Sequence, residues 1–347
     1  MPTGRDVGVA DPESVLAAAE SLEHEGRAVE AIRLLTEANR DAGNQRLEER
    51  LVVARHAAFK AVHHIPPVDL PAPIFSAPRD EAPLQPVPAA ELTPEVLRAG
   101  LARHGCVWVR GLITPSRAER LARGVDRALD GFDASASGAG VGDTSPWYVP
   151  FSPETGTYRV GGRRNWVRAS GAVWTVDSPR MLFELCELLD DTRMVELVTA
   201  HLGERPALSA NKCTLRRVPI DTSTNWHQDG AFLGASVRTL NLWLALSDCD
   251  GDSPGLEIVP RRIDTVLPTG TEGAMFDWSV SPDIVDDVAR EAPVLTPAFR
   301  AGDALLFDHL LLHRTAVEPG MTRERYAIET WHFAPSSYPD GQIPVVL

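Results

Sequence analysis

The feature that most constrains the fold is a small set of metal-ligating side chains spread far apart along the chain. His227 and Asp229 are separated by one residue, a spacing that puts both side chains on one face of a β-strand. A third ligand, His313, comes far downstream, and His309 is its rival four residues earlier. Only a folded scaffold brings either histidine back to the pair. The chain must therefore form a structure in which distant segments converge on one point.

Two imidazoles and one carboxylate on one face of an octahedron leave three positions open, which is typical of non-haem Fe(II) oxygenases. Structural zinc sites are instead usually closed by four nitrogen or sulfur ligands. Gln228 lies between two inward-facing residues, so we expect its side chain to point away from the metal.

The surrounding sequence resembles the phytanoyl-CoA dioxygenase family of Fe(II)/2-oxoglutarate-dependent oxygenases. Four pieces carry the resemblance, which spans roughly residues 97–335: Trp226-His227-Gln228-Asp229, Trp243-Leu244-Ala245-Leu246, Gly302-Asp303 leading to His313, and Arg325 before Ala327-Ile328. The resemblance implies Fe(II) held by His227, Asp229 and His313, with the spacing from Gly302-Asp303 selecting His313 over His309. One departure is Pro260-Arg261-Arg262, where the family commonly has Pro-Gly-Ser-His.

The same resemblance implies 2-oxoglutarate as cosubstrate and O2 as oxidant. The far carboxylate of 2-oxoglutarate needs a cation, ideally a bidentate guanidinium. Arg325 is the candidate, aided by the Thr315 hydroxyl and flanked by Trp243. Arg323 is the alternative, because its side chain has the same strand parity.

The function implied is hydroxylation of a small-molecule metabolite, with release of succinate and CO2. The carboxylate of Asp229 favours this outcome over halogenation, because related halogenases have a small residue there; desaturation, epimerisation or ring formation would use the same iron. Two alternatives remain: a catalytically silent jelly-roll scaffold, and a metalloenzyme that uses the same triad without 2-oxoglutarate.

The periodicity predicts an α+β fold, with a double-stranded β-helix (a cupin-like jelly roll) flanked by helices. Short strands separated by turns are typical of this architecture. We expect strands over residues 207–218, 224–229, 238–248, 255–259, 292–296, 303–308 and 325–333. Residues 262–290 look like an insertion with a short helix over the mouth of the barrel.

The chain divides into three parts. Residues 1–64 predict a helical extension, with a tetratricopeptide-like helix pair and a third helix, packed on the main domain or forming a homodimer. Residues 65–92 are a proline-rich linker. Residues 93–347 form the oxygenase domain, which opens at Thr93-Pro94 with a helix cap.

A long irregular stretch over residues 133–170 predicts an active-site lid. It contains Arg164, Trp166 and Arg168, which we name as candidate substrate contacts, with local ion pairs as the alternative role for the arginines. Glu329 is a further candidate, because alternation from Arg325 turns it inward. A buried Glu329 would need substrate or an arginine as its partner.

The charge balance argues against nucleic acid as a partner, since the net charge is −14 and such binding needs a basic face. Of 34 basic residues only Lys60 and Lys212 are lysine, a skew that we interpret as coding bias. No apolar run is long enough to span a membrane. Four scattered cysteines, without a Cys-X-X-Cys pair, favour a reduced, cytoplasmic enzyme.

Overall fold

A computed structural model describes residues 11–62, 83–138, 146–153, 161–222 and 224–347. Within these ranges, nine strands form one large sheet and two more form a small one. The path through the large sheet is β1-β2-β8-β6-β10-β4-β11, with β5 also paired to β10 and β3 to β5. The strands are β1 Val87–Pro88, β2 Cys106–Arg110, β3 Ala172–Trp174, β4 Ala207–Ser209, β5 Thr214–Val218, β6 Thr239–Ala245, β7 Gly255–Ile258, β8 Ala304–Phe307, β9 His313–Ala316, β10 Arg325–Phe333 and β11 Pro344–Val346.

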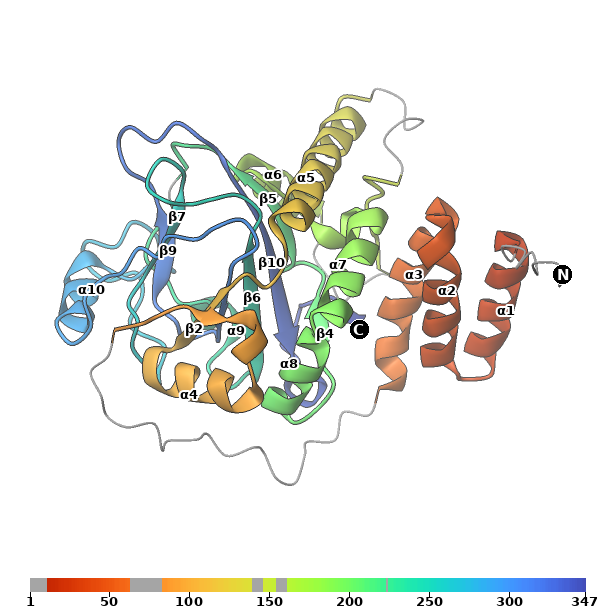
Figure 1. Ribbon diagram of the computed structural model, residues 1–347, viewed down its shortest axis with the longest axis horizontal. Helices are drawn as coiled ribbons and strands as arrows, with labels where there is room; N and C mark the ends of the chain where they lie inside the picture. The colour runs from red at the N-terminus through yellow and green to blue at the C-terminus, as the bar shows by residue number, and fades with distance from the viewer. Residues whose placement is uncertain (1–10, 63–82, 139–145, 154–160, 223) are drawn as a thin grey trace, which may run out of the picture.

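The large sheet is covered on both faces, which explains why every residue of β6 is buried. Leu240, Leu242 and Leu244 point to one face and join the apolar core under the helices. Trp243 and Ala245 point to the other face, where they join a second core with residues of the small β7–β9 sheet. Figure 1 shows the resulting order of layers, with α7 and α8 on one side of the large sheet and β7 and β9 on the other.

Two helices of the main domain begin at a threonine cap followed by proline. The Thr93 hydroxyl accepts a hydrogen bond from the Val96 amide at 3.3 Å, and Thr114 caps the next helix in the same way. The second helix runs to Ala136, and Phe132 belongs to its buried face. The helices are α4 Pro94–His104, α5 Pro115–Ala136, α6 Gly161–Ala169, α7 Pro179–Asp191, α8 Met194–Leu202, α9 Gly230–Leu233 and α10 Pro282–Ala289.

The extension consists of α1 Pro12–His24, α2 Ala28–Ala42, α3 Gln45–Ala57 and a short 3₁₀ helix, Ala58–Ala61. Its third helix packs on α7 and β11 of the same chain. The Arg55 guanidinium donates to the Val346 carbonyl at 2.9 Å, and buried Glu48 pairs with Arg180. The extension therefore shares a core with the main domain, and these contacts give no support to the homodimer predicted through its helices.

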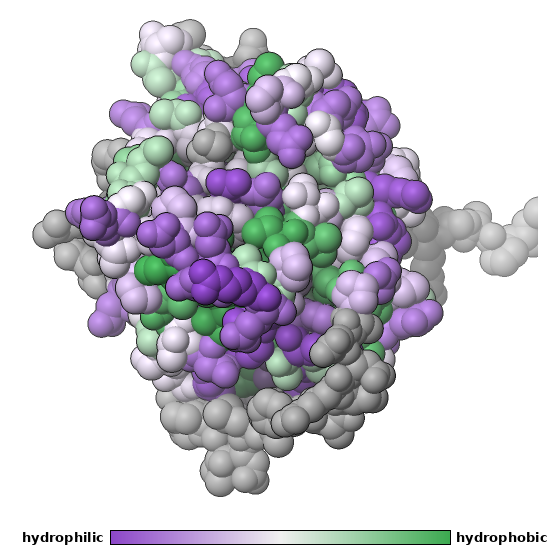
Figure 2. All heavy atoms as spheres, turned by 90° about the vertical axis from the view of Figure 1, so that its left-hand side faces the viewer, coloured by the Kyte–Doolittle hydropathy of each residue, from purple (hydrophilic) through white to green (hydrophobic). Residues whose placement is uncertain are grey.

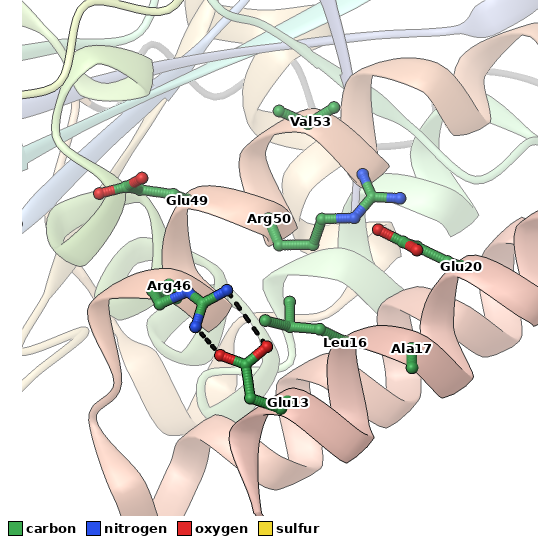
Figure 3. Close-up of a pocket in the computed structure, with 8 residues that line it drawn as sticks. All are labelled: Glu13, Leu16, Ala17, Glu20, Arg46, Glu49, Arg50 and Val53. Atoms are coloured by element: carbon green, nitrogen blue, oxygen red, sulfur yellow. Dashed lines mark hydrogen bonds and ion pairs between the residues drawn. The ribbon is translucent and has the colours of Figure 1, made fainter.

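A shallow cavity lies between α1 and α3 of the extension (Figure 3). Glu13 and Arg46 form an ion pair across it, and Arg50 pairs with Glu23 nearby. These two ion pairs tie α1 to α3.

Two expected irregular segments contain more structure than the sequence indicated. The linker expected over 65–92 lies partly outside the described residues, since 63–82 are not described, but Val87–Pro88 pairs in parallel with β2 and Ala89–Glu91 is a 3₁₀ helix. The lid expected over 133–170 is wrong at both ends, because α5 continues to Ala136 and α6 spans Gly161–Ala169. Residues 139–145 and 154–160 of that stretch lie outside the described residues.

The strand expected over 292–296 is reduced to a single bridge between Leu295 and Ile258. The helix expected within 262–290 is α10, which buries Val285 against a small apolar cluster with Trp226 and Leu312. No helix in the described ranges is long and apolar enough to cross a membrane.

Gly302 in the Gly-Asp turn offers a test of the fold. Its φ is +98°, and a Cβ there would lie 2.2 Å from the Ile113 carbonyl oxygen. Gly320 has nearly the same φ, +99°, with open space around it. We expect Gly320→Ala to lower the free energy of unfolding by about 1 kcal/mol, and Gly302→Ala by roughly 3 kcal/mol or more, because it adds a backbone clash. Chemical denaturation of both variants measures this difference, and equal losses would contradict the steric argument.

Candidate metal centre

The structure brings His227, Asp229 and His313 together. Their potential ligand atoms all lie within 4.8 Å of one another, and in the described residues these three form the one His, Cys, Asp or Glu cluster able to hold a metal. His313 opens β9, and its backbone exchanges two hydrogen bonds with that of His227, at 3.0 and 3.1 Å. This antiparallel bridge sets the two imidazole rings 4.4 Å apart, centre to centre.

The prediction of a strand over 224–229 is wrong, although His227 and Asp229 do lie close together. His227 makes only the single bridge to His313, and Asp229 has helical backbone angles at the start of α9. The chain turns here because Gly230 packs tightly: its amide donates to the His309 carbonyl at 2.7 Å, and a Cβ would lie 2.8 Å from Val266. The tight turn, and not strand alternation, aims Asp229 at the histidines.

Both imidazoles are oriented as metal ligands usually are. The Nδ1–H of His227 donates to the Asn225 carbonyl at 2.7 Å, and that of His313 donates to the Leu311 carbonyl at 3.0 Å. Because a carbonyl oxygen can only accept, each bond fixes the proton on Nδ1 and leaves the Nε2 lone pair free. The Nε2 of His313 lies 3.7 Å from the Asp229 carboxylate. Such outer hydrogen bonds are the rule around bound metals, so the donor set fits a metal ion.

The electrostatics favour the metal-binding protonation states of His227 and Asp229. Burial, reinforced by His313, lowers the pKa of His227 to about 4, so its imidazole is neutral at pH 7. Burial alone would raise the pKa of Asp229, but Lys212 and the two histidines outweigh it and lower the pKa. The Lys212 ammonium lies 3.3 Å from the Asp229 carboxylate.

A pocket between the two sheets opens beside the histidines. On β10, Arg325 is 1% exposed and points into it. One guanidinium nitrogen donates to the Gly255 carbonyl at 2.8 Å, but Nε has no partner. Burial lowers the pKa of Arg325 to about 10, so the group stays charged at pH 7. The pocket is lined by Arg216, Thr224, His227, Trp243, Leu256, Phe307, His313, Thr315, Arg325 and Glu329.

Thr315 and Trp243, both predicted beside the cosubstrate, lie in this pocket with Arg325. The guanidinium carbon of Arg325 is 5.4 Å from the Trp243 ring centre. The two rivals lie elsewhere. Arg323 is exposed and pairs with Asp250 and Asp252, while the His309 ring approaches the Ala235 carbonyl and packs against Gly230.

Glu329 reaches the pocket from β10, as alternation predicts, and there it meets an arginine. Arg216 on β5 approaches its carboxylate to 3.3 Å, and Asn241 and Trp331 donate to it at 3.2 and 3.3 Å. The structure thus supplies the partner that a part-buried carboxylate needs. Any substrate contact by Glu329 would share these bonds.

The three candidates from the expected lid do not reach this pocket. Arg164 forms a two-pronged ion pair with buried Asp177, at 2.7 Å for each bond. Arg168 pairs with Asp133, and Trp166 is 69% exposed on α6. Both guanidinium groups have the local ion-pair role that was the alternative for them.

Sequence reasoning missed several residues around the triad, notably Lys212, Arg216, Thr224, Phe232 and Trp278. Lys212 carried a signal, because lysine is rare in this chain, but the rarity alone gave it no location. The others became visible only when the fold placed β5, α9 and the segment before α10 beside His227.

Two histidines and one aspartate that converge beside two facing sheets are the ligand set of a metal-dependent protein. Comparison of the sequence with known families identifies its family. The sequence profile of phytanoyl-CoA dioxygenase matches residues 101–317, so the chain belongs to this family. Its resemblance to that family is thereby confirmed. No curated protein sequence matches the chain.

One enzyme of known structure, EctD, shares the fold at low sequence identity. EctD from S. alaskensis with 2-oxoglutarate and 5-hydroxyectoine superposes with a TM-score of 0.51 and 15% identity, over 79% of this chain and 84% of that one. The same enzyme with bound Fe gives a TM-score of 0.51 and 14% identity, over 79% and 85%. AviO1 from Streptomyces viridochromogenes Tue57 gives 0.45 and 19%, over 72% and 98%.

Proposed function

We propose that this protein is an Fe(II)- and 2-oxoglutarate-dependent oxygenase that hydroxylates a small molecule, with succinate and CO2 as co-products. The observation that carries the proposal is the shared pocket: two histidines of the triad and the buried Arg325 line one cavity between two facing sheets. We assign this core to the jelly-roll class, whose facing sheets suit a site built from distant strands.

The donor set supports iron. Two imidazoles and one carboxylate with open positions are the arrangement that non-haem Fe(II) oxygenases use. Bound there, iron and 2-oxoglutarate would supply the oxidising power to functionalise a C–H bond. The chain's own contribution is to fix the three ligands: carbonyl hydrogen bonds orient His227 and His313, and Lys212 keeps Asp229 ionised.

The pocket supports a dianionic keto acid as cosubstrate. A buried guanidinium without an acidic partner is costly, and a ligand carboxylate would relieve that cost. Arg325 has a free Nε and a planar fork suited to two parallel hydrogen bonds. Thr315 lies two residues after His313 on β9, so its side chain shares the face of that ligand. EctD, which has a similar fold, was solved with 2-oxoglutarate and with Fe.

We also place the enzyme in the cytoplasm. Its four cysteines, Cys106, Cys186, Cys213 and Cys249, are buried and free, which suits a reducing compartment.

Anaerobic titration of the Fe(II)-loaded protein with 2-oxoglutarate tests the function. Chelation of iron by a keto acid gives a weak visible charge-transfer band, which we expect to appear and saturate. Glutarate, which has both carboxylates but no keto group, is the matched control and should give none. If the protein bound Fe(II) but showed no band with 2-oxoglutarate, the assignment of the cosubstrate would be wrong. If it bound no Fe(II), the assignment as an iron-dependent enzyme would be wrong.

A further inference from the structure

The triad has a second side that the pocket does not include. Asp229 is absent from the lining of the Arg325 pocket, and its carboxylate instead meets Lys212. On this outer side the ring of His227 contacts two aromatic rings, Trp278 at 5.8 Å and Phe232 at 6.3 Å between centres. A ligand that fills the inner pocket would leave this outer side free.

Four apolar side chains form the outer side, and we call them the aromatic rim: Phe232, Met275, Phe276 and Trp278. Phe276 stacks on Trp278, with ring centres 5.1 Å apart and planes 8° from parallel, and Phe232 lies 5.5 Å from Trp278. The rim is nevertheless open to solvent, since Phe232 is 46%, Phe276 48% and Met275 72% exposed. Clustered exposed apolar groups next to a reactive centre mark a ligand surface.

Backbone hydrogen bonds hold the rim in place. The Val280 amide donates to the carbonyl of Trp226, the residue before His227, at 2.8 Å. Gly270 donates to Ser279, and Ser279 donates to Phe276, each at 3.0 Å. Residues 275–278 of the rim precede α10. The face of the molecule that carries α10 shows apolar patches among hydrophilic side chains (Figure 2). These bonds fix the backbone that carries Phe276 and Trp278 before any ligand arrives, which reduces the entropic cost of binding.

Lys212 supplies a cation at the edge of the rim. It sits in the turn between β4 and β5, and its ammonium lies 4.9 Å from the centre of the Phe232 ring. Lys212 is one of only two lysines in a chain that otherwise uses arginine for its basic groups. A compact ammonium reaches Asp229 with one proton and keeps others for a ligand, whereas a planar guanidinium is bulkier.

We propose that the substrate is a small molecule with a planar apolar ring and a carboxylate. The ring packs on Phe232 and Trp278, and the carboxylate faces Lys212, so the ring edge lies beside the triad. The assignment of this surface as a substrate site rests on the proposed function. The surface itself is present without iron, so ligand binding to it can be measured separately. The positive edge of the rim disfavours a cationic ring compound.

2-Naphthoate is a suitable probe, because it joins a planar ring to a carboxylate. We would titrate it into the metal-free, full-length protein and follow binding by ligand-observed NMR. Phe232→Ala and Trp278→Ala should each weaken binding by about tenfold, since each removes an aromatic contact. Lys212→Met should weaken it by about fivefold. Trp166→Ala, which removes an exposed tryptophan on α6, is the matched control and should change nothing.

The following binding results would contradict the proposed substrate site. Unchanged affinity in Phe232→Ala and Trp278→Ala would overturn it, as would a loss confined to Arg325→Ala, which would place the probe in the inner pocket. Equal binding of 2-naphthylmethylammonium would overturn the role of Lys212. Thermal melting checks that the variants fold, which we expect because the rim is exposed. Failure of the charge-transfer band with naphthoate binding retained would instead contradict only the oxygenase function.

Discussion

Replacing His313 by alanine is expected to abolish productive binding of Fe(II). His313 is one of the three proposed protein ligands and is also the backbone bridge partner of His227. Loss of an outer hydrogen-bond partner around a metal already costs roughly 10- to 100-fold in affinity, and loss of a ligand should cost more. Anaerobic Fe(II) titration measures the affinity, and succinate formation should fall below detection. The backbone bridge does not need the side chain, so the variant should still fold.

His309→Ala is the matched control, because His309 was the rival ligand and lies four residues earlier. Its ring approaches the Ala235 carbonyl and the tight turn at Gly230, and it is not a member of the ligand cluster. We expect this variant to lose some stability and to keep Fe(II) binding. If His309→Ala lost iron while His313→Ala retained it, the assignment of the third ligand would be wrong.

The meeting of His313 with His227 and Asp229 could be predicted because the sequence resembles the phytanoyl-CoA dioxygenase family, whose spacing from Gly302-Asp303 selects His313 over His309. The capped helices at Thr93 and Thr114 could be predicted because a hydroxyl before a proline favours one local structure. Strand β6 was visible as an apolar run, since both of its faces are covered.

The route by which Asp229 reaches the site could not be predicted. Strand alternation seemed sufficient, but the chain turns into α9 after His227 because Gly230 packs against Val266 and His309, which lie far away in the sequence. The same limitation hid the aromatic rim, whose members come from α9 and from the segment before α10. Contacts between distant segments carry no periodicity of their own.

The two arginines named as candidate substrate contacts lie away from the pocket for a different physical reason. Arginines in a Gly- and aromatic-rich stretch look like an anion site, yet Arg164 is drawn to the buried Asp177 carboxylate and Arg168 to Asp133. A buried carboxylate needs a partner more than a solvated arginine needs a ligand. The part-buried carboxylate of Glu329 likewise needs a charged partner, and Arg216 provides one.

Arg325→Ala is expected to remove most of the affinity for 2-oxoglutarate while iron binding persists. Arg325 is buried, charged and without an acidic partner, so its guanidinium is available to the far carboxylate of the cosubstrate. Truncating one partner of a buried charge pair costs about 2–4 kcal/mol, or roughly 30- to 1,000-fold in Kd. The charge-transfer band on anaerobic Fe(II) protein gives the Kd for 2-oxoglutarate directly.

Arg323→Ala separates a specific contact from a general loss of positive charge. Arg323 lies two residues earlier with the same strand parity, but it is exposed and pairs with Asp250 and Asp252. It should leave the Kd for 2-oxoglutarate within about twofold, because exposed ion pairs contribute little. Arg325→Lys sharpens the test: a single ammonium keeps the charge but not the planar fork, so its Kd should lie between those of wild type and Arg325→Ala. Unchanged 2-oxoglutarate binding in Arg325→Ala, with a loss in Arg323→Ala, would mean that the cosubstrate approaches the iron from outside the pocket between the sheets.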